Sequence, residues 1–269
     1  MNKELILRIS VFVLSIIQVL TPVFSSFNDN QKKNNFDPPI TPAGYTFAVW
    51  GIITLLGLCY GAYQLLPNRP TADLHQKVGK ILCVVYALFS LWLFAASRDW
   101  LWITVLIFTV MFGLLFMLFQ IIQENNQQLT VADKILLEGQ VGIYLGWTTI
   151  AIFANTASAL SYYGLLTMGN MGMVIQAVLL ILALLNSMYG IGKTNGNYFL
   201  SATILWAFVG VYFGLRQNGN TTVLQIIVIS AIFVFISFFI FIKLRLFPTT
   251  PIPNSKYPLQ APNNRNEYL

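Results

Sequence analysis

The sequence carries few charged residues: they make up 9% of its 269 residues, whereas soluble domains have about 25%. Hydrophobic residues account for 57%, and the mean hydropathy is +0.69. Such a chain has too few polar side chains to cover a surface in water, which excludes a soluble enzyme, a disordered chain and a coiled coil. We therefore predict an integral membrane protein whose main partner is the lipid bilayer.

The sequence is also short of residues that bind metals or act in catalysis. It has one histidine, His75, and two cysteines, Cys59 and Cys83, which do not form a CxxC pair. This spacing excludes a zinc framework, and no apolar run holds a cluster of ligating side chains, so we expect no metal site. We expect two buried thiols, a solvated histidine in a loop, and no catalytic residues.

The net charge of +6 does not indicate a nucleic-acid partner, because the basic residues lie near the ends of apolar runs. If the N-terminus is cytoplasmic, eleven of the 15 Lys and Arg residues fall on the cytoplasmic side. The positive-inside rule then predicts that both termini are cytoplasmic.

Eight apolar runs reach the length of about 20 residues that a membrane-spanning helix needs. The runs lack the alternation of barrel strands, so we predict an all-α membrane protein with about eight transmembrane helices. The predicted spans are Leu5–Phe24, Ala43–Leu66, Val78–Ser97, Trp100–Ile122, Leu136–Leu160, Met171–Gly190, Tyr198–Leu215 and Val223–Lys243. The first span, with its basic start, also fits a cleaved signal peptide, and both alternatives stay open.

Two connections give sharper local predictions. Only Arg98 and Asp99 separate the third and fourth spans, which predicts a tight helical hairpin. At the start of the second span, Thr41 fits an N-cap and Pro42 fits the first helical position.

The start of the fifth span holds several polar residues. Thr130 and Asp133 have capping-box spacing, which predicts a helix start near Val131. Glu138 is the one acid clearly within a span. Either it pairs with Lys134 at the surface or it takes part in a proton relay.

Small residues four apart let membrane helices approach closely. Three GxxxG pairs mark the second, fifth and seventh spans as contact helices: Gly57/Gly61, Gly142/Gly146 and Gly210/Gly214. They predict packing and carry no information about function.

The fifth span also carries a polar and aromatic stripe, which should face the protein interior because an amide is costly against hydrocarbon. Its members are Gln140, Tyr144, Trp147, Thr148, Ala151 and Asn155. The stripe is either an ordinary interhelical hydrogen-bonding face or the wall of an apolar pocket. Tyr45, Phe47 and Trp50, in the first turns of the second span, form either an interfacial aromatic belt or the mouth of that pocket.

These two stretches resemble the TspO family, the tryptophan-rich sensory proteins related to the mitochondrial translocator protein. The second span reads Pro39-Ile-Thr-Pro42-Ala-Gly-Tyr45-Thr-Phe47-Ala-Val-Trp50, and the fifth reads Tyr144-Leu-Gly-Trp147-Thr-Thr-Ile-Ala151-Ile-Phe-Ala-Asn155. The third span has the family's Trp and Phe at Trp92 and Phe94, without the Asn expected before them.

The resemblance implies a five-helix core over residues 1–165, and the chain continues with three additional helices over 166–245. The segment over 246–269 is rich in Pro and Asn, which predicts a disordered cytoplasmic tail. The resemblance also implies a pocket for flat or bulky apolar ligands, such as a tetrapyrrole or a sterol-like lipid, with no other cofactor. The implied ligand-binding residues are Tyr45, Phe47, Trp50, Trp92, Tyr144, Trp147, Ala151 and Asn155. The longer members that this chain resembles are bacterial, which implies an inner (plasma) membrane location, and a homodimer is an open alternative.

We therefore expect a ligand-binding membrane protein that acts as a sensor, regulator or carrier. A secondary transporter of a small apolar or amphipathic substrate is the alternative, although the sequence shows no inverted repeat. An enzyme acting on the ligand is the third hypothesis, and no residue pattern supports it.

Overall fold

The structure is a computed structural model that describes residues 3–24, 38–66, 72–166, 169–218 and 221–246. Within these ranges it holds eight helices that are long and apolar enough to cross a membrane, and no strand. The all-α fold predicted from composition is therefore confirmed. The long helices are α1 (Lys3–Phe24), α2 (Val49–Tyr63), α3 (Ala72–Ser97), α4 (Leu101–Glu124), α6 (Gln140–Tyr162), α7 (Asn170–Lys193), α8 (Tyr198–Gln217) and α9 (Thr222–Leu246).

Four shorter elements adjoin these helices. The 3-10 helix η2 (Gly44–Ala48) leads into α2. Helix α5 (Val131–Asp133) and the π-helix η4 (Lys134–Gly139) run into α6, so that one span covers Val131–Tyr162. A single 3-10 turn, η3 (Asn126–Gln128), follows α4.

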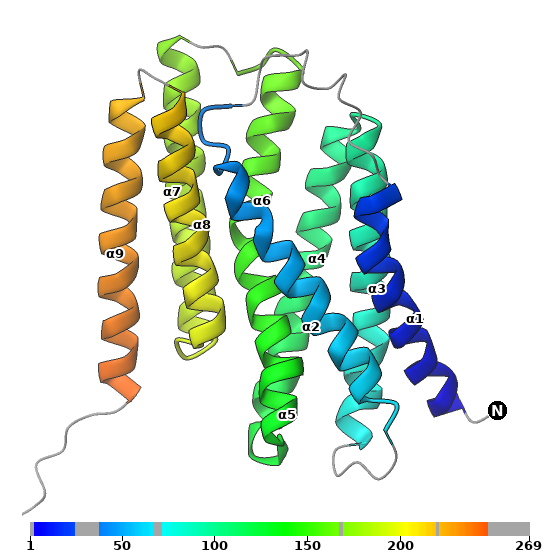
Figure 1. The fold of residues 1–269 in the computed structure, drawn as a ribbon. Coiled ribbons are helices and arrows are strands. Elements are labelled where there is room, and N and C mark those ends of the chain that lie inside the picture. The colour runs from blue at the N-terminus through cyan, green and yellow to red at the C-terminus, as the bar shows by residue number, and fades with distance from the viewer. Residues whose placement is uncertain (1–2, 25–37, 67–71, 167–168, 219–220, 247–269) are drawn as a thin grey trace, which may run out of the picture.

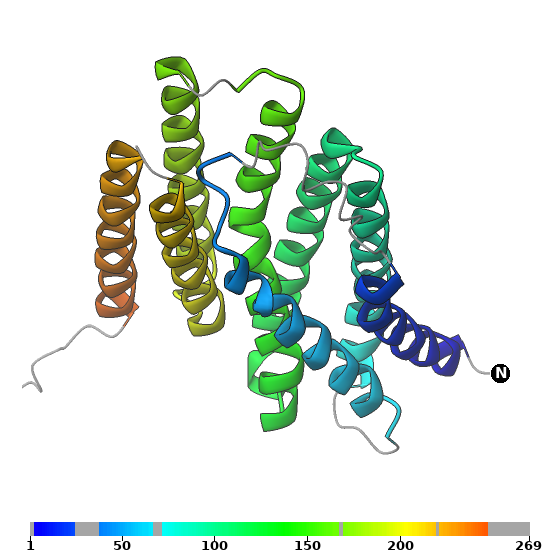
Figure 2. The same ribbon diagram turned by 45° about the horizontal axis from the view of Figure 1, so that its top comes forward.

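The helices form one bundle, with α1 and α3 at one edge and α9 at the other (Figure 1). Helix α6 lies in the middle, where it packs against α4, α7 and α8. Helix α2 crosses the front of α6 obliquely in both views (Figure 2). The start of α1 and the end of α9 lie at the same end of the bundle, as eight crossings require. The predicted tail over 246–269 lies almost entirely outside the described residues.

Local sequence signals place several helix ends correctly. Helix α3 ends at Ser97 and α4 begins at Leu101, and the turn between them places Asp99 in the left-handed region at a φ of 59°. The predicted capping box is also confirmed: the Thr130 side chain accepts from the Asp133 backbone N–H, and the Asp133 side chain accepts from the Thr130 backbone N–H. The long span therefore starts at Val131.

The second span starts at Gly44, next to its predicted start, but the predicted N-cap is wrong. Thr41 does not cap a helix: the N-cap of η2 is Ala43, and α-helical structure begins only at Val49. The reason is a long-range contact, because the backbone N–H of Ala43 donates to the Gly210 carbonyl of α8 at 2.9 Å. The backbone before η2 is therefore held against α8, and it does not form the first turn of an α-helix.

The glycine pairs act as packing sites, as predicted. A Cβ added at Gly146 would lie 2.7 Å from the Leu200 carbonyl oxygen, so α6 and α8 meet backbone to backbone there. A Cβ at Gly61 would lie 3.1 Å from Phe12 Cα of α1. The third pair differs: Gly210 and Gly214 contact residues that precede the α-helical part of the second span, Thr46 and Thr41.

Two predictions about single side chains need correction. Cys59 is exposed on the outside of the bundle and Cys83 is half-buried, so they are not two buried thiols. Cys59 lies on an apolar span, and its small apolar side chain is as compatible with lipid hydrocarbon as with the protein interior. His75 is not a solvated loop residue: it lies in α3 with 2% of its surface exposed.

Candidate functional site

Trp50 is the centre of a group of six aromatic side chains. The group, called here the aromatic cluster, consists of Trp50, Phe89, Trp92, Phe108, Tyr144 and Trp147. The Trp50 ring stacks on Trp92 with centroids 5.2 Å apart, and it meets Tyr144 edge-on at 5.5 Å. These rings come from α2, α3, α4 and α6, so the cluster ties together the helices on which the TspO-like motifs lie.

The aromatic cluster contains two unused hydrogen-bond donors. The indole nitrogens of Trp50 and Trp92 are buried, and neither finds an acceptor among the described residues. Buried indole N–H groups usually have a partner, because leaving one unpaired costs about 1–3 kcal/mol. The two orphan donors lie on rings that stack on each other, with centroids 5.2 Å apart, so both belong to the same part of the aromatic cluster.

Phe47 and Tyr45, in η2 before Trp50, both lie partly at the outside of the bundle. The Phe47 ring meets Trp147 edge-on at 5.6 Å, while 41% of its surface is exposed. Tyr45 is 49% exposed and contacts Trp206 and Phe213 of α8, at 5.6 and 6.3 Å. Phe47 therefore connects the buried cluster to the bundle surface, whereas Tyr45 belongs to a contact with α8.

The last two stripe residues lie one and two turns beyond Trp147 on α6. Ala151 is buried, and Asn155 accepts a hydrogen bond from Thr104 of α4 at 3.1 Å while donating to the Ala151 carbonyl at 2.8 Å. The Asn155 amide thus forms an interhelical hydrogen bond, one of the two roles that the stripe left open. The burial of Gln140, Tyr144, Trp147, Thr148 and Ala151 agrees with the prediction that the stripe faces inward.

A polar layer lies along α6 next to the cluster. Tyr86 of α3 and Gln140 are both buried and exchange two hydrogen bonds, at 3.0 and 2.8 Å. Gln18 of α1 donates to the Tyr144 hydroxyl at 3.4 Å. Sequence reasoning named Gln140 and Tyr144 but not their partners on α1 and α3, which no local motif marks.

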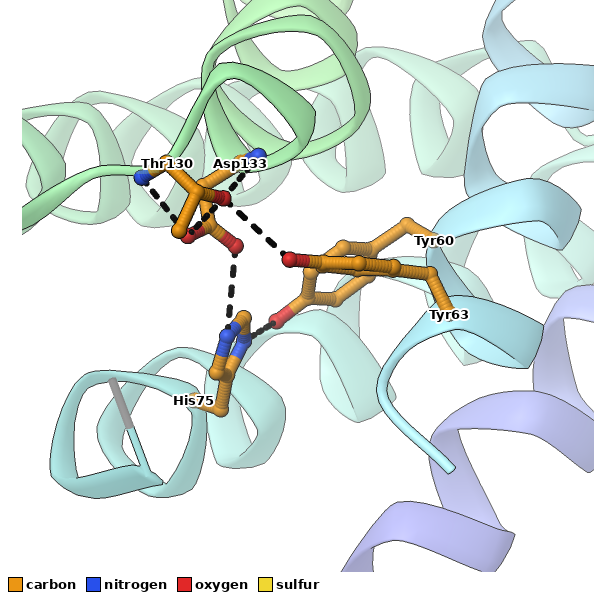
Figure 3. Close-up of polar contacts among 5 residues, drawn as sticks. All are labelled: Tyr60, Tyr63, His75, Thr130 and Asp133. Carbon is orange, nitrogen blue, oxygen red and sulfur yellow. Dashed lines mark hydrogen bonds and ion pairs between the residues drawn. The ribbon is translucent and has the colours of Figure 1, made fainter. Parts of the chain in front are cut away.

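A second polar centre lies at the end of the bundle where α2 finishes (Figure 3). His75 Nε2 is 3.3 Å from Asp133 Oδ1, and His75 Nδ1 is 2.8 Å from the Tyr60 hydroxyl. The Tyr63 hydroxyl lies 3.2 Å from Thr130 Oγ1, which donates to Asp133. With the imidazole proton on Nε2, the ring donates to the carboxylate and accepts from Tyr60. The centre joins α2, α3 and α5.

Glu138 has a partner that neither sequence interpretation proposed. Its carboxylate accepts a hydrogen bond from Asn197 Nδ2 at 2.7 Å. Asn197 is also the N-cap of α8, where its side chain accepts from the Leu200 backbone N–H. Glu138 therefore fixes the start of α8 to the π-helical part of the fifth span.

The described residues contain no group of three or more His, Cys, Asp or Glu side chains placed to hold a metal ion. A cavity of about 10 Å³ lies apart from the aromatic cluster, between α6, α7 and α8, with Ile40, Phe153 and Phe208 among its lining residues. It has the volume of about one water molecule and an apolar lining, so we assign it no site.

Comparison with known proteins places these features in a family. A family model described as TSPO-like protein matches residues 4–243, which includes all eight long helices except their outermost residues. The match therefore extends beyond the five-helix core in which the TspO-like motifs lie. No curated protein and no solved structure matches the chain.

Proposed function

Because the chain belongs to the family of TSPO-like proteins, we propose that it binds a planar or bulky apolar small molecule, such as a tetrapyrrole or a sterol-like lipid, at the aromatic cluster. Binding would serve a sensor, regulator or carrier role. The family and the eight apolar helices make the chain an integral membrane protein. We further propose a bacterial plasma-membrane location with both termini cytoplasmic, which the distribution of Lys and Arg supports.

The observation that carries this proposal is the pair of orphan indole N–H groups within the cluster. Aromatic faces suit a planar ring by stacking, and an oxygen on the ligand would satisfy Trp50 or Trp92. A porphyrin carboxylate and a sterol hydroxyl both supply such an acceptor. Because the six rings already touch, the ligand would displace ring contacts as it enters, and the half-exposed Phe47 lies at the surface in contact with Trp147 of the cluster.

The proposal is tested by titrating a porphyrin into the detergent-purified protein and following the shift of the porphyrin absorption band. We expect Trp147→Ala to raise Kd by about tenfold or more, since one large buried aromatic contact is lost. Trp102→Ala is the matched control, because Trp102 is 44% exposed on α4 and contacts Tyr163 outside the cluster. Equal Kd values for wild type and Trp147→Ala would overturn the assignment of the site.

A secondary transporter remains the alternative, and one observation favours it. Transporters build their substrate sites from helices that are interrupted inside the membrane. The second span is comparable, since its non-α-helical residues Ala43 and Thr46 lie against Gly210 and Trp206, well inside the length of α8. Uptake of a porphyrin or sterol probe into proteoliposomes that exceeds the uptake into protein-free vesicles would support the transporter hypothesis.

A further inference from the structure

The residues before α2 run through part of the bundle without forming an α-helix. This lead-in segment, Pro38–Thr46, contacts α8 along its length, from Gly214 near Thr41 to Trp206 near Thr46. Trp206 lies eleven residues before the end of α8, which corresponds to about 16 Å of a helix about 30 Å long. The lead-in segment therefore reaches roughly half the depth of α8 before α-helical structure begins at Val49 (Figure 1).

Such a segment needs partners, because hydrocarbon offers none to exposed backbone N–H and C=O groups. Helices α7 and α8 supply them. The Ile40 N–H donates to Gln176 Oε1 at 3.2 Å, and Gln176 is 2% exposed. The Ala43 N–H donates to the Gly210 carbonyl at 2.9 Å, and Trp206 Nε1 donates to the Thr46 carbonyl at 3.1 Å.

The surface of α8 is also shaped to receive the segment. A Cβ added at Gly214 would overlap the Thr41 carbonyl oxygen, and one at Gly210 would overlap the Thr46 side chain. Only glycine at these two positions lets the backbone of the lead-in segment lie directly on the helix. By contrast, Gly190 of α7 has no atom within 4 Å of the corresponding position.

These contacts end where the candidate ligand site begins. Thr46, held by Trp206 and Gly210, is followed by Phe47, whose ring lies 5.6 Å from Trp147. Trp147 in turn lies 6.1 Å from Trp50. A displacement of the Thr46 backbone would therefore move Phe47, an exposed ring that contacts the aromatic cluster at Trp147.

We infer that Trp206, Gly210 and Gly214 are positioning residues of the ligand site: α8 holds the lead-in segment so that Phe47 is placed on Trp147. The three helices after residue 166 are then part of the binding unit and not an appended module. The inference rests on the proposed function for its effect on ligand binding, and on geometry alone for the placement of Phe47.

The experiment compares Gly214→Ala and Trp206→Phe with two matched controls, Gly190→Ala and Trp102→Phe. Gly190→Ala adds the same methyl group where nothing lies within 4 Å, and Trp102→Phe alters another exposed tryptophan. Each purified variant is titrated with a porphyrin.

A second measurement reports the placement of the rings without any ligand. The ligand-free protein is labelled with 5-fluorotryptophan, and the ¹⁹F resonance of Trp147 is recorded after it has been assigned with the variant Trp147→Phe. A variant that loses only stability would not shift this resonance while it stays folded.

We expect Gly214→Ala and Trp206→Phe to shift the Trp147 resonance and to raise Kd by about fivefold to tenfold, with both controls like wild type. An unshifted resonance in both test variants overturns the inference, and so does a shifted resonance with unchanged Kd. If wild type binds no porphyrin, the proposed binding of planar ligands is overturned instead. The resonance alone then decides whether α8 positions Phe47.

Discussion

His75 of α3 and Asp133 at the start of the fifth span form a buried pair, with Nε2 and Oδ1 separated by 3.3 Å. They are 2% and 0% exposed, and Tyr60 and Thr130 provide further hydrogen bonds. Buried ionisable side chains are tolerated when such partners surround them. The pair therefore holds α2, α3 and α5 together at the end of the bundle away from the lead-in segment.

Replacing His75 by Ala should destabilise the protein by about 3 kcal/mol, because Asp133 would keep its buried carboxylate without the imidazole. The thermal midpoint in detergent is the measurement. Glu4→Gln is the control, since the pair that Glu4 forms with Arg8 lies at the surface and contributes about 1 kcal/mol or less. Equal midpoints for the two variants would show that the buried pair contributes no more than a surface pair.

The capping box at the start of the fifth span should contribute less. Thr130→Ala removes the acceptor for the Asp133 backbone N–H and should cost about 1 kcal/mol. Thr130→Ser keeps the hydroxyl and should retain most of that stability. Chemical or thermal unfolding of both variants gives the comparison, and a Ser variant as unstable as the Ala variant would assign the loss to the methyl group.

Close packing of α6 on α8 predicts a strong effect at Gly146. Gly146→Ala would place a Cβ 2.7 Å from the Leu200 carbonyl oxygen and 2.9 Å from Thr203 Cβ, so the helices must separate, at a cost of about 1–3 kcal/mol. Gly113→Ala is the matched control, because nothing lies within 4 Å of its added methyl group. The result to look for is a lower thermal midpoint in the first variant only.

The hydrogen bonds between Tyr86 and Gln140 can be measured by a double-mutant cycle. Interhelical hydrogen bonds in membranes contribute about 0.6 kcal/mol on average and reach about 1.7 kcal/mol. Two bonds between buried groups should bring the coupling of Tyr86→Phe and Gln140→Leu to the upper part of that range. If the effects of the two substitutions on the free energy of unfolding are additive, the coupling energy between Tyr86 and Gln140 is zero.

The sequence predicted those features that depend on neighbouring residues. Span lengths follow from apolar runs, the hairpin at Asp99 from a two-residue connection, and the start of the fifth span from the spacing of Thr130 and Asp133. The inward stripe on α6 follows from helical periodicity in the same way. Each of these signals lies within a few turns of the element that it determines.

The features that sequence reasoning missed all depend on residues far along the chain. His75 is buried because Asp133 reaches it from another helix, and Glu138 is paired because Asn197 begins α8 beside it. Phe89 and Phe108 join the aromatic cluster only because α3 and α4 pack beside α2. Whether the cluster binds a ligand depends on chemistry that neither periodicity nor packing fixes.

The lead-in segment also constrains the order in which the protein is built. Ile40 is synthesised 136 residues before its partner Gln176, and Thr46 is synthesised 160 residues before Trp206. Until α7 and α8 have entered the bilayer, the polar backbone of the segment has no partner there. The lead-in segment therefore gains these polar partners only after the C-terminal helices have been synthesised. We expect its packing on α8 to be a late step of biogenesis.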